Sequence, residues 1–447
     1  MLKSVMEERF QNKEIVIFNS PLYHDSWDDE EDHLPPLGLG YIITGLYKAG
    51  ISATLIDTIY EKLGVNEIAN IINNNNFPNV GFNLFSTNYL LVKEVLDKVS
   101  RSVHVYLGGK VVAYLWKEIF SWNLHQPITV IIGEGELILP DLLNQQSKEA
   151  PIFKDYEKCV MVVNKNSVYY PYNLDFITLA RNLFRHRGIC NHYGRIEHCI
   201  IASRGCIYNC AFCGGSIYAN PDISPRTRSV GSLSAEIKDI LTYVPETGSI
   251  RVLDDLFLRN RVSILDAVHL FKSFPQLHWR CMAHVKSFVG NLDLLKALKE
   301  SGCDEVFIGI ESGNPDVRKF INKQGTVENV VEVVTSLLNS GIDVKGYFIC
   351  GFPEETIQQL QDSVNLANTL KSISKSVEGN FRAVAFQFRP YHGTQLYHYL
   401  IHGRGNDFTY SLRDKSIARR KQYNFSAGNF SNATDEELEA SIKQIME

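Results

Sequence analysis

The chain has 447 residues, of which 45% are hydrophobic, and its formal net charge at pH 7 is −5. This composition is typical of two or three globular domains and offers no basic surface for nucleic acid. The amino terminus is charged, and no apolar run reaches the roughly 18 residues of a membrane-spanning helix, so we expect a cytoplasmic protein without a membrane partner.

The first 145 residues alternate between short apolar strands and helical stretches. Five strands joined by helical crossovers predict an α/β fold with a parallel, doubly wound, Rossmann-like sheet. The expected strands are 15–18, 53–57, 80–83, 103–107 and 128–132, and the expected helices are 40–49, 67–73, 90–100 and 115–120.

Small or polar residues follow four of these strands, and sheets of this kind bind ligands beyond the carboxyl ends of their strands. A glycine pair alone is more often a tight turn, but glycines also let a large flat ligand approach the backbone closely. Four such edges together favour a binding site. Its candidate residues are Ser20, Pro21, Ser86, Thr87, Gly108, Gly109, Gly133, Glu134 and Gly135.

Residues 146–195 are expected to form a linker, with a small hairpin over residues 160–170. A second alternating run follows and predicts six strand–helix units. Its strands are expected at 198–203, 250–253, 278–283, 305–310, 344–350 and 383–388, and its helices at 234–243, 262–274, 292–301, 327–340 and 356–370.

The alternation ends near residue 396. Residues 433–446 predict an amphipathic helix, capped by Thr434, that either covers the barrel or contributes to substrate binding. The expected domains are therefore residues 1–145, a linker over 146–195, a second domain over 196–395 and a helical extension over 396–447.

Three of the nine cysteines, Cys206, Cys210 and Cys213, fall within eight residues and form a C-x3-C-x2-C run. Thiolates are the usual ligands of iron–sulfur clusters, and three ligands leave the fourth iron of a cubane open to a small molecule. Zinc is the rival ligand, but it requires a fourth Cys or His at close spacing. Buried core cysteines are the remaining alternative.

This run, with Phe212 before its last cysteine, resembles the radical S-adenosylmethionine (radical SAM) superfamily. The resemblance implies a partial (β/α)6 barrel and a [4Fe–4S] cluster bound by the three cysteines. It also implies that the open iron chelates S-adenosylmethionine (SAM), and that an electron from a partner such as flavodoxin or ferredoxin splits SAM into methionine and a 5′-deoxyadenosyl radical.

Strand ends of the second run match SAM-binding stretches of this family. Asp254 and Asp255 match residues that hold the amino group of SAM, although they are as well explained as a helix-capping pair. The Gly309–Gly313 stretch matches the residues that bind the ribose and the methionine end, and Gly351 lies where the backbone meets adenine. Arg280 and His284 lie on the third strand and could face the barrel, although a satisfied core histidine is the more ordinary explanation of His284. The residues assigned to SAM are Asp254, Asp255, Glu311, Ser312 and Gly351.

The run Pro35-Pro36-Leu37-Gly38-Leu39-Gly40 resembles the amino-terminal domain of cobalamin-binding radical SAM enzymes. That resemblance implies that Leu37 and the four glycine-rich or polar strand edges hold cobalamin. No Asp-x-His-x-x-Gly motif is present in the sequence, so cobalt is expected to lack a histidine ligand and to lie over the loop at 84–88. A bulky side chain at Gly109 is expected to clash with the corrin. The alternative is a domain of this shape that binds nothing.

The two resemblances together predict a cobalamin-dependent radical SAM methyltransferase. It is expected to methylate an unactivated carbon of a natural-product or peptide precursor through methylcobalamin and a 5′-deoxyadenosyl radical. A cobalamin-binding radical enzyme that rearranges, cyclises or contracts a ring is the first alternative. An iron–sulfur electron carrier fits poorly, because a carrier has no use for an incomplete ligand set.

Overall fold

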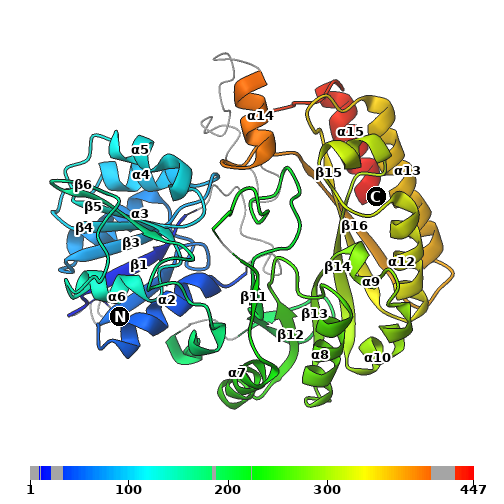
Figure 1. Ribbon diagram of the computed structural model, residues 1–447, viewed down its shortest axis with the longest axis horizontal. Helices are drawn as coiled ribbons and strands as arrows, with labels where there is room; N and C mark the ends of the chain where they lie inside the picture. Colours follow the sequence, from blue (N-terminus) through cyan, green and yellow to red (C-terminus); the bar gives the residue numbers. More distant parts are fainter. Residues whose placement is uncertain (1–9, 11, 22–33, 184–187, 223, 404–427) are drawn as a thin grey trace. The chain divides into compact units, whose positions relative to one another are not determined.

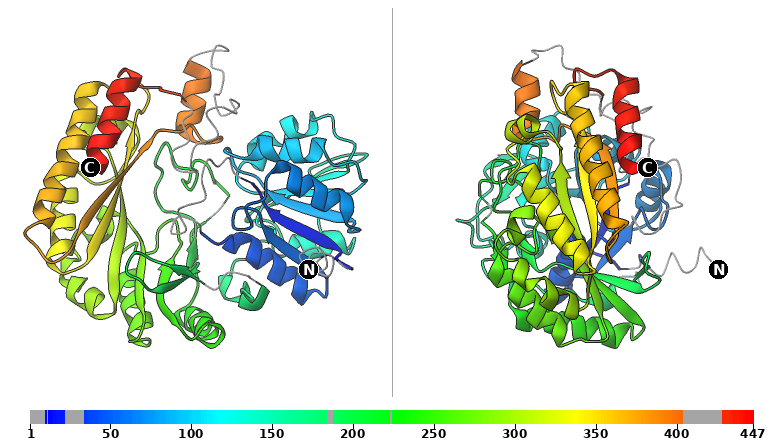
Figure 2. Two further views of the ribbon diagram at one scale, coloured as in Figure 1. Left: turned by 180° about the vertical axis from the view of Figure 1, so that it is seen from behind. Right: turned by 90° about the vertical axis from the view of Figure 1, so that its right-hand side faces the viewer.

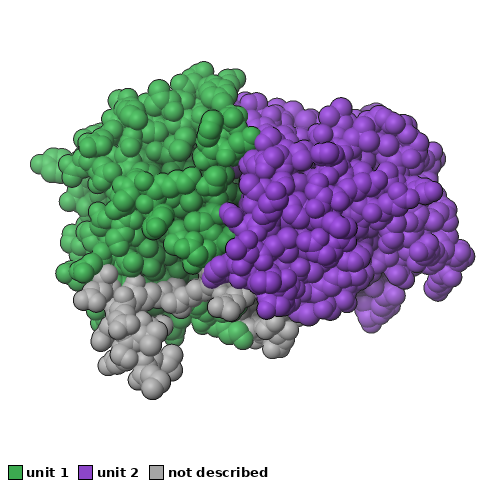
Figure 3. Space-filling model, turned by 90° about the horizontal axis from the view of Figure 1, so that it is seen from below, with its two compact units in different colours: residues 1–187 green, residues 188–447 purple. Residues whose placement is uncertain are grey.

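The computed structural model describes residues 10, 12–21, 34–183, 188–222, 224–403 and 428–447. The chain forms two compact units, residues 1–187 and 188–447, which Figure 3 shows in different colours. Each unit contains a seven-stranded sheet. None of the helices within the described ranges is long and apolar enough to cross a membrane.

The sheet of the first unit has the strand order β2-β1-β3-β4-β5-β7-β6 (Figure 1). All neighbouring strands are parallel except β6 and β7. The order reverses between β1 and β3, which is where doubly wound sheets bind their ligands. The elements are β1 (Ile15–Asn19), α2 (Leu37–Lys48), β2 (Ala53–Asp57), α3 (Val65–Asn74), β3 (Asn79–Asn83), α4 (Tyr89–Asp97), β4 (His104–Gly108), α5 (Val112–Phe120), β5 (Ile128–Gly133), α6 (Ile138–Leu143), β6 (Phe153–Asp155) and β7 (Lys158–Val163).

Apolar side chains alternate between the two faces of this sheet, as the two-residue period of a strand requires. Val16 and Phe18 of β1 face a core that also holds side chains of α3, α4 and α5. Ile15 and Ile17 face the opposite core, which is completed by α2 and α6. The predicted doubly wound sheet is confirmed.

The residues expected to form a linker contain two strands of this sheet. β7 pairs in parallel with β5 and antiparallel with β6, so the hairpin turns at Tyr156, which has a φ of 41°. The hairpin predicted over residues 160–170 is therefore wrong. The apolar run in β7 completes the sheet beside β5, whereas Tyr169 and Tyr170 are buried side chains outside any strand.

The second sheet has the strand order β16-β15-β14-β13-β12-β9-β8, with β8 as an antiparallel edge strand. The six other strands are parallel and form a curled half-barrel, with helices along its outer face (Figures 1 and 2). The elements are β8 (Ile189–Cys190), β9 (Ile196–Ile200), α7 (Val230–Tyr243), β12 (Thr247–Val252), α8 (Arg261–Lys272), β13 (His278–Ala283), α9 (Val285–Phe288), α10 (Leu295–Glu300), β14 (Cys303–Glu311), α11 (Pro315–Phe320), α12 (Val327–Asn339), β15 (Asp343–Cys350), α13 (Ile357–Ser374) and β16 (Phe381–Gln387). The predicted partial barrel is confirmed.

The carboxyl-terminal segment supports this half-barrel. α15 (Asp435–Met446) packs against α13 and β16, and the Oγ1 of Thr434 accepts the N–H of Glu437 as the predicted cap. The helix therefore covers the outer side of the barrel. α14 (Gln395–Gly403) precedes it at the start of the expected helical extension, and residues 404–427 lie outside the described part of the chain.

Candidate functional site

The three cysteines lie on a loop that follows β10 (Ser203–Arg204), which pairs with β11 (Arg226–Thr227). The chain turns at Gly205, whose φ is +86°. Two backbone N–H groups point at the sulfurs, because Tyr208 N lies 3.4 Å from Cys206 Sγ and Gly215 N lies 3.3 Å from Cys213 Sγ. Such hydrogen bonds stabilise cluster-bound thiolates, so the loop fits an iron–sulfur cluster.

Neighbouring segments fix this loop from two sides. The N–H of Ala211 donates to the carbonyl of Ile321 at 2.9 Å, and the side-chain amide of Asn322 donates to the carbonyl of Asn209 at 2.8 Å. On the other side, the N–H of Leu396 donates to the carbonyl of Ala211 at 2.9 Å. Hydrogen bonds from both sides therefore fix the backbone that carries the cysteines.

Burial disfavours charge on all three thiols. It raises the pKa of Cys206 and of Cys210, and it raises the pKa of Cys213 to about 12. The positive charge of Lys323 opposes this effect at Cys206 and Cys210. Thiolates at this depth need bound cations for compensation, which the irons of a cluster supply.

The two aspartates after β12 differ in their surroundings. Asp254 is buried and accepts hydrogen bonds from Ala202 N at 2.7 Å and Ser203 Oγ at 2.6 Å, and burial raises its pKa to about 6. Both of its oxygens thus accept hydrogen bonds inside the protein, and its contact with the amino group of SAM stays a prediction. Asp255 is exposed, and its carboxylate lies 3.3 Å from where a Cβ on Gly215 would be.

Glu311 ends β14 in a left-handed conformation, with a φ of 66°. Its Oε1 lies 3.0 Å from the Nζ of Lys323, and both side chains are buried. A Cβ on Gly309 would lie 2.2 Å from this Oε1, so only glycine allows the carboxylate to fold back over the strand. Lys323 was not found from the sequence, because it lies in a turn that carries no local pattern.

Ser312 and Gly351 are placed by packing within the protein. Ser312 is fully buried, and its Oγ lies 3.3 Å from Ser363 Oγ and accepts the N–H of Asn314 at 3.1 Å. The N–H of Gly351 donates to Glu355 Oε2 at 2.7 Å, and a Cβ there would lie 3.0 Å from Leu438 of α15. The contacts of Ser312 and Gly351 with SAM stay predictions beside these internal contacts.

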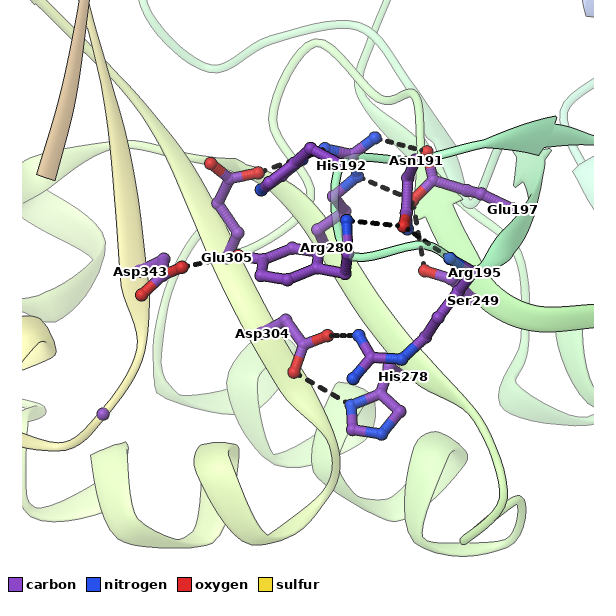
Figure 4. Close-up of polar contacts among 12 residues, drawn as sticks. Asn191, His192, Arg195, Glu197, Ser249, His278, Arg280, Asp304, Glu305 and Asp343 are labelled. Atoms are coloured by element: carbon purple, nitrogen blue, oxygen red, sulfur yellow. Dashed lines mark hydrogen bonds and ion pairs between the residues drawn. The ribbon is translucent and has the colours of Figure 1, made fainter. Parts of the chain in front are cut away.

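At the opposite end of the half-barrel, where the strands begin, charged side chains form a paired network (Figure 4). Arg280 donates from Nε and Nη2 to the two oxygens of Glu197 at 2.6 and 2.7 Å, and from Nη1 to Glu305 at 3.2 Å. Arg382 donates to the other oxygen of Glu305 at 2.6 Å. Arg280, Glu197 and Glu305 are each at most 3% exposed, so the network is buried.

In the first unit, hydrogen bonds join the carboxyl ends of β1, β2 and β3. Asn19 donates to Asp57 at 2.9 Å, Asn83 donates to Asn19 at 3.0 Å, and the N–H of Ser20 donates to Asn83 at 2.7 Å. The Oγ of Ser20 is buried and has no hydrogen-bond partner among the described residues. The strand edge at the reversal of strand order is thus polar, and within the described residues the Ser20 hydroxyl is left for a ligand.

The glycines of this edge fall into two classes. Gly109 and Gly133 have φ values of +100° and +101°, and a Cβ on them would lie 2.4 Å from Leu84 O and 2.1 Å from Val163 O. A side chain at Gly109 therefore clashes first with Leu84, and its clash with the corrin stays a prediction. A Cβ on Gly108 would have only Ile131 O at 4.0 Å, and one on Gly135 would approach Ile42 at 3.5 Å, so this part of the edge has room.

The other predicted cobalamin residues lie at the same edge. Leu37 is buried at the first position of α2, and Ser86 is buried in the loop at 84–88. This loop is held by the Asn88 side chain, which accepts the N–H of Phe85 at 2.8 Å. Thr87 and Glu134 are half-buried in the loops after β3 and β5. The residues present therefore fit a large flat ligand.

Two known protein families match this chain, one in each of its two units. The family model described as the radical SAM superfamily matches residues 200–367, and the B12 binding domain model matches residues 31–143. The matched ranges contain the cysteine loop and the glycine-rich strand edges, respectively.

Relatives and solved structures extend the similarity over most of the chain. The uncharacterized methyltransferase PH0819 of Pyrococcus horikoshii is 27% identical over 375 residues, which are 82% of this chain and 78% of that protein. The radical SAM methyltransferase TsrM of Kitasatospora setae, solved with cobalamin and a [4Fe–4S] cluster, has a TM-score of 0.64 at 15% identity and covers 89% of this chain and 79% of its own.

The cobalamin-dependent SAM radical enzyme OxsB has a TM-score of 0.66 at 16% identity, with 97% of this chain and 66% of OxsB covered. At these identities the two structures support the fold, and the family models support the domains. The chain therefore contains a B12-binding domain followed by a radical SAM domain, and its fold is similar to that of the cobalamin-dependent radical SAM proteins TsrM and OxsB.

Proposed function

We propose that this protein is a cobalamin-dependent radical SAM enzyme that methylates an unactivated carbon of a natural-product or peptide precursor. The observation that carries the proposal is the presence, in one chain, of a three-cysteine cluster loop on a half-barrel and a B12-type sheet with an open glycine edge. The methyltransferases among the similar proteins support the same reaction class.

Cys206, Cys210 and Cys213 would hold the cluster, which when bound supplies the electron that cleaves SAM. Asp255 is the exposed carboxylate beside the cluster loop, so it is suited to hold the ammonium group of SAM. Glu311 keeps a fixed orientation through Lys323 and is suited to accept hydrogen bonds from the ribose hydroxyls.

The strand edge of the first unit would hold cobalamin, which when bound supplies the methyl group. Ser20 offers its unused hydroxyl, and Gly108 leaves space at the end of β4. The loop at 84–88 contains no histidine, so no imidazole from this loop would coordinate cobalt. A flavodoxin- or ferredoxin-like reductant, a cytoplasmic location and the absence of a nucleic-acid partner remain predictions.

Product stoichiometry tests this function. With its substrate, the anaerobically reconstituted enzyme should form one 5′-deoxyadenosine and one S-adenosylhomocysteine per product, because one SAM gives the radical and one gives the methyl group. The methyl carbon of isotopically labelled SAM should appear on a carbon atom of the product. Product and 5′-deoxyadenosine without S-adenosylhomocysteine would instead favour a rearrangement, a cyclisation or a ring contraction.

A further inference from the structure

His284 occupies a distinct position at the end of the third barrel strand. Trp279, Cys281 and Ala283 of β13 face the helix-side core, so the alternate residues of β13 face the inside of the half-barrel. His284 continues this alternation in an extended conformation, with φ −110° and ψ 147°. It therefore faces inward, between the strand ends that carry Asp255 and Glu311.

One ring nitrogen of His284 is used within the protein and the other is not. Nδ1 accepts the N–H of Lys286 at 3.1 Å, so the proton of the neutral ring is on Nε2. Burial, followed by the charges of Lys323, Arg318 and Lys286, lowers the pKa of His284 to about 2, which keeps the ring neutral. The side chain is 5% exposed, and Nε2 has no hydrogen-bond partner among the described residues. The acceptor for a buried donor in this state is a bound water or a ligand.

The surroundings of His284 indicate which acceptor fits. Its ring lies 4.1 Å from the ring of Tyr208, centroid to centroid, and Tyr208 stands between two of the cluster cysteines. Three cations act on His284, namely Lys323, Arg318 and Lys286. Glu311 pairs with Lys323, whereas Arg318 donates to the backbone carbonyls of Ile310 and Ser312 at 2.6 and 3.0 Å. The local charge is therefore in positive excess, which favours an anionic group.

We propose that His284 binds the methionyl carboxylate of SAM by donating its Nε2–H to a carboxylate oxygen. The inference rests on the proposed function and adds one residue to its SAM site. Of the two charged groups on the methionyl end, the carboxylate fits the positive side near His284, and the ammonium fits Asp255 on the neighbouring strand.

Two variants remove the Nε2–H donor of His284 while each keeps one of its other contacts. H284F keeps an aromatic ring on Tyr208, and H284N keeps a side-chain acceptor for the N–H of Lys286. Both lack the Nε2–H, so both should bind SAM about tenfold or more weakly in the cluster-reconstituted full chain. H284Q, which places an amide N–H near the position of Nε2, should recover part of the affinity. Anaerobic equilibrium dialysis with labelled SAM measures the binding.

Decarboxylated SAM tests the assignment to the carboxylate, since wild type and H284F should bind it with equal affinity. An unchanged SAM affinity in both H284F and H284N would overturn the proposal. An equal loss for SAM and decarboxylated SAM would also overturn it, as would a shifted cluster reduction potential with unchanged SAM affinity. If wild-type protein with an intact cluster fails to bind SAM, the proposed function itself is wrong.

Discussion

The two ends of the half-barrel use charged side chains in opposite ways. Where the strands begin, Arg280 forms buried ion pairs with Glu197 and Glu305 (Figure 4). Where the strands end, Asp255 is exposed, and His284 keeps a buried donor without an acceptor among the described residues. The charges at the base are paired within the protein, whereas Asp255 and His284 at the opposite edge are positioned to contact a ligand.

This difference separates stability from function within one sheet. Removing one member of a buried ion network leaves its partner charged and unpaired, which is strongly destabilising. Removing a residue that faces a ligand should weaken ligand binding and leave folding almost unchanged. Variants at the two ends are therefore expected to give different phenotypes.

Replacing all three of Cys206, Cys210 and Cys213 with Ala should have the largest effect at the strand-end edge. Reconstituted wild type should contain about four irons per chain, and the variant should lose the iron, the brown chromophore and 5′-deoxyadenosine formation. Iron analysis and absorption spectroscopy measure this. C190A, at an exposed cysteine, is the control and should keep the cluster. A cubane retained in the triple variant would contradict the assignment.

At the base, E197A should lower the free energy of unfolding by about 3–5 kcal/mol, because Arg280 loses its bidentate partner. Urea unfolding followed by circular dichroism measures the change. R261A, which breaks the exposed pair with Asp293, is the matched control and should have little effect. Equal stability losses in the two variants would contradict the importance of burial in the network.

The glycine edge of the first unit offers the same contrast on adjacent residues. G109A should lower the free energy of unfolding by about 1–3 kcal/mol. The φ of +100° at this position disfavours any side chain, and the new Cβ would clash with the carbonyl of Leu84. G108F has room for its Cβ and should keep the fold while losing cobalamin. Thermal unfolding and cobalt analysis distinguish the two outcomes. Normal cobalamin binding by G108F would place the ligand elsewhere.

The smallest expected effect is on the pH dependence of stability and involves Glu355, which accepts the N–H of Gly351. Burial raises its pKa from 4.5 to about 7, so the folded state binds the proton more tightly than the unfolded state. The resulting stabilisation is complete below about pH 4.5 and declines as the pH rises towards about 7. E355Q should flatten this decline in urea unfolding at a series of pH values. An unchanged pH dependence in E355Q would show that Glu355 titrates normally.

The sequence predicted both sheets and the position of the cysteine loop and the glycine-rich segments at strand ends, because short-range patterns encode them. Strand periodicity and cysteine spacing are visible within a few residues. The internal contacts of Asp254, Ser312 and Gly351 involve residues far away in the chain, such as Ser363 and Leu438. The open donor of His284 also depends on which ring nitrogen the backbone of Lys286 occupies. Such contacts become apparent only in the folded chain.

The most direct test of the strand-end site is magnetic resonance of the reduced cluster with SAM labelled with ¹³C at its carboxylate. We predict that SAM changes the EPR signal and that ENDOR detects a coupling between the cluster and the labelled carbon. This coupling should be lost in the triple variant of Cys206, Cys210 and Cys213. An intact reduced cluster whose EPR signal is unchanged by saturating SAM would contradict an open iron at this edge.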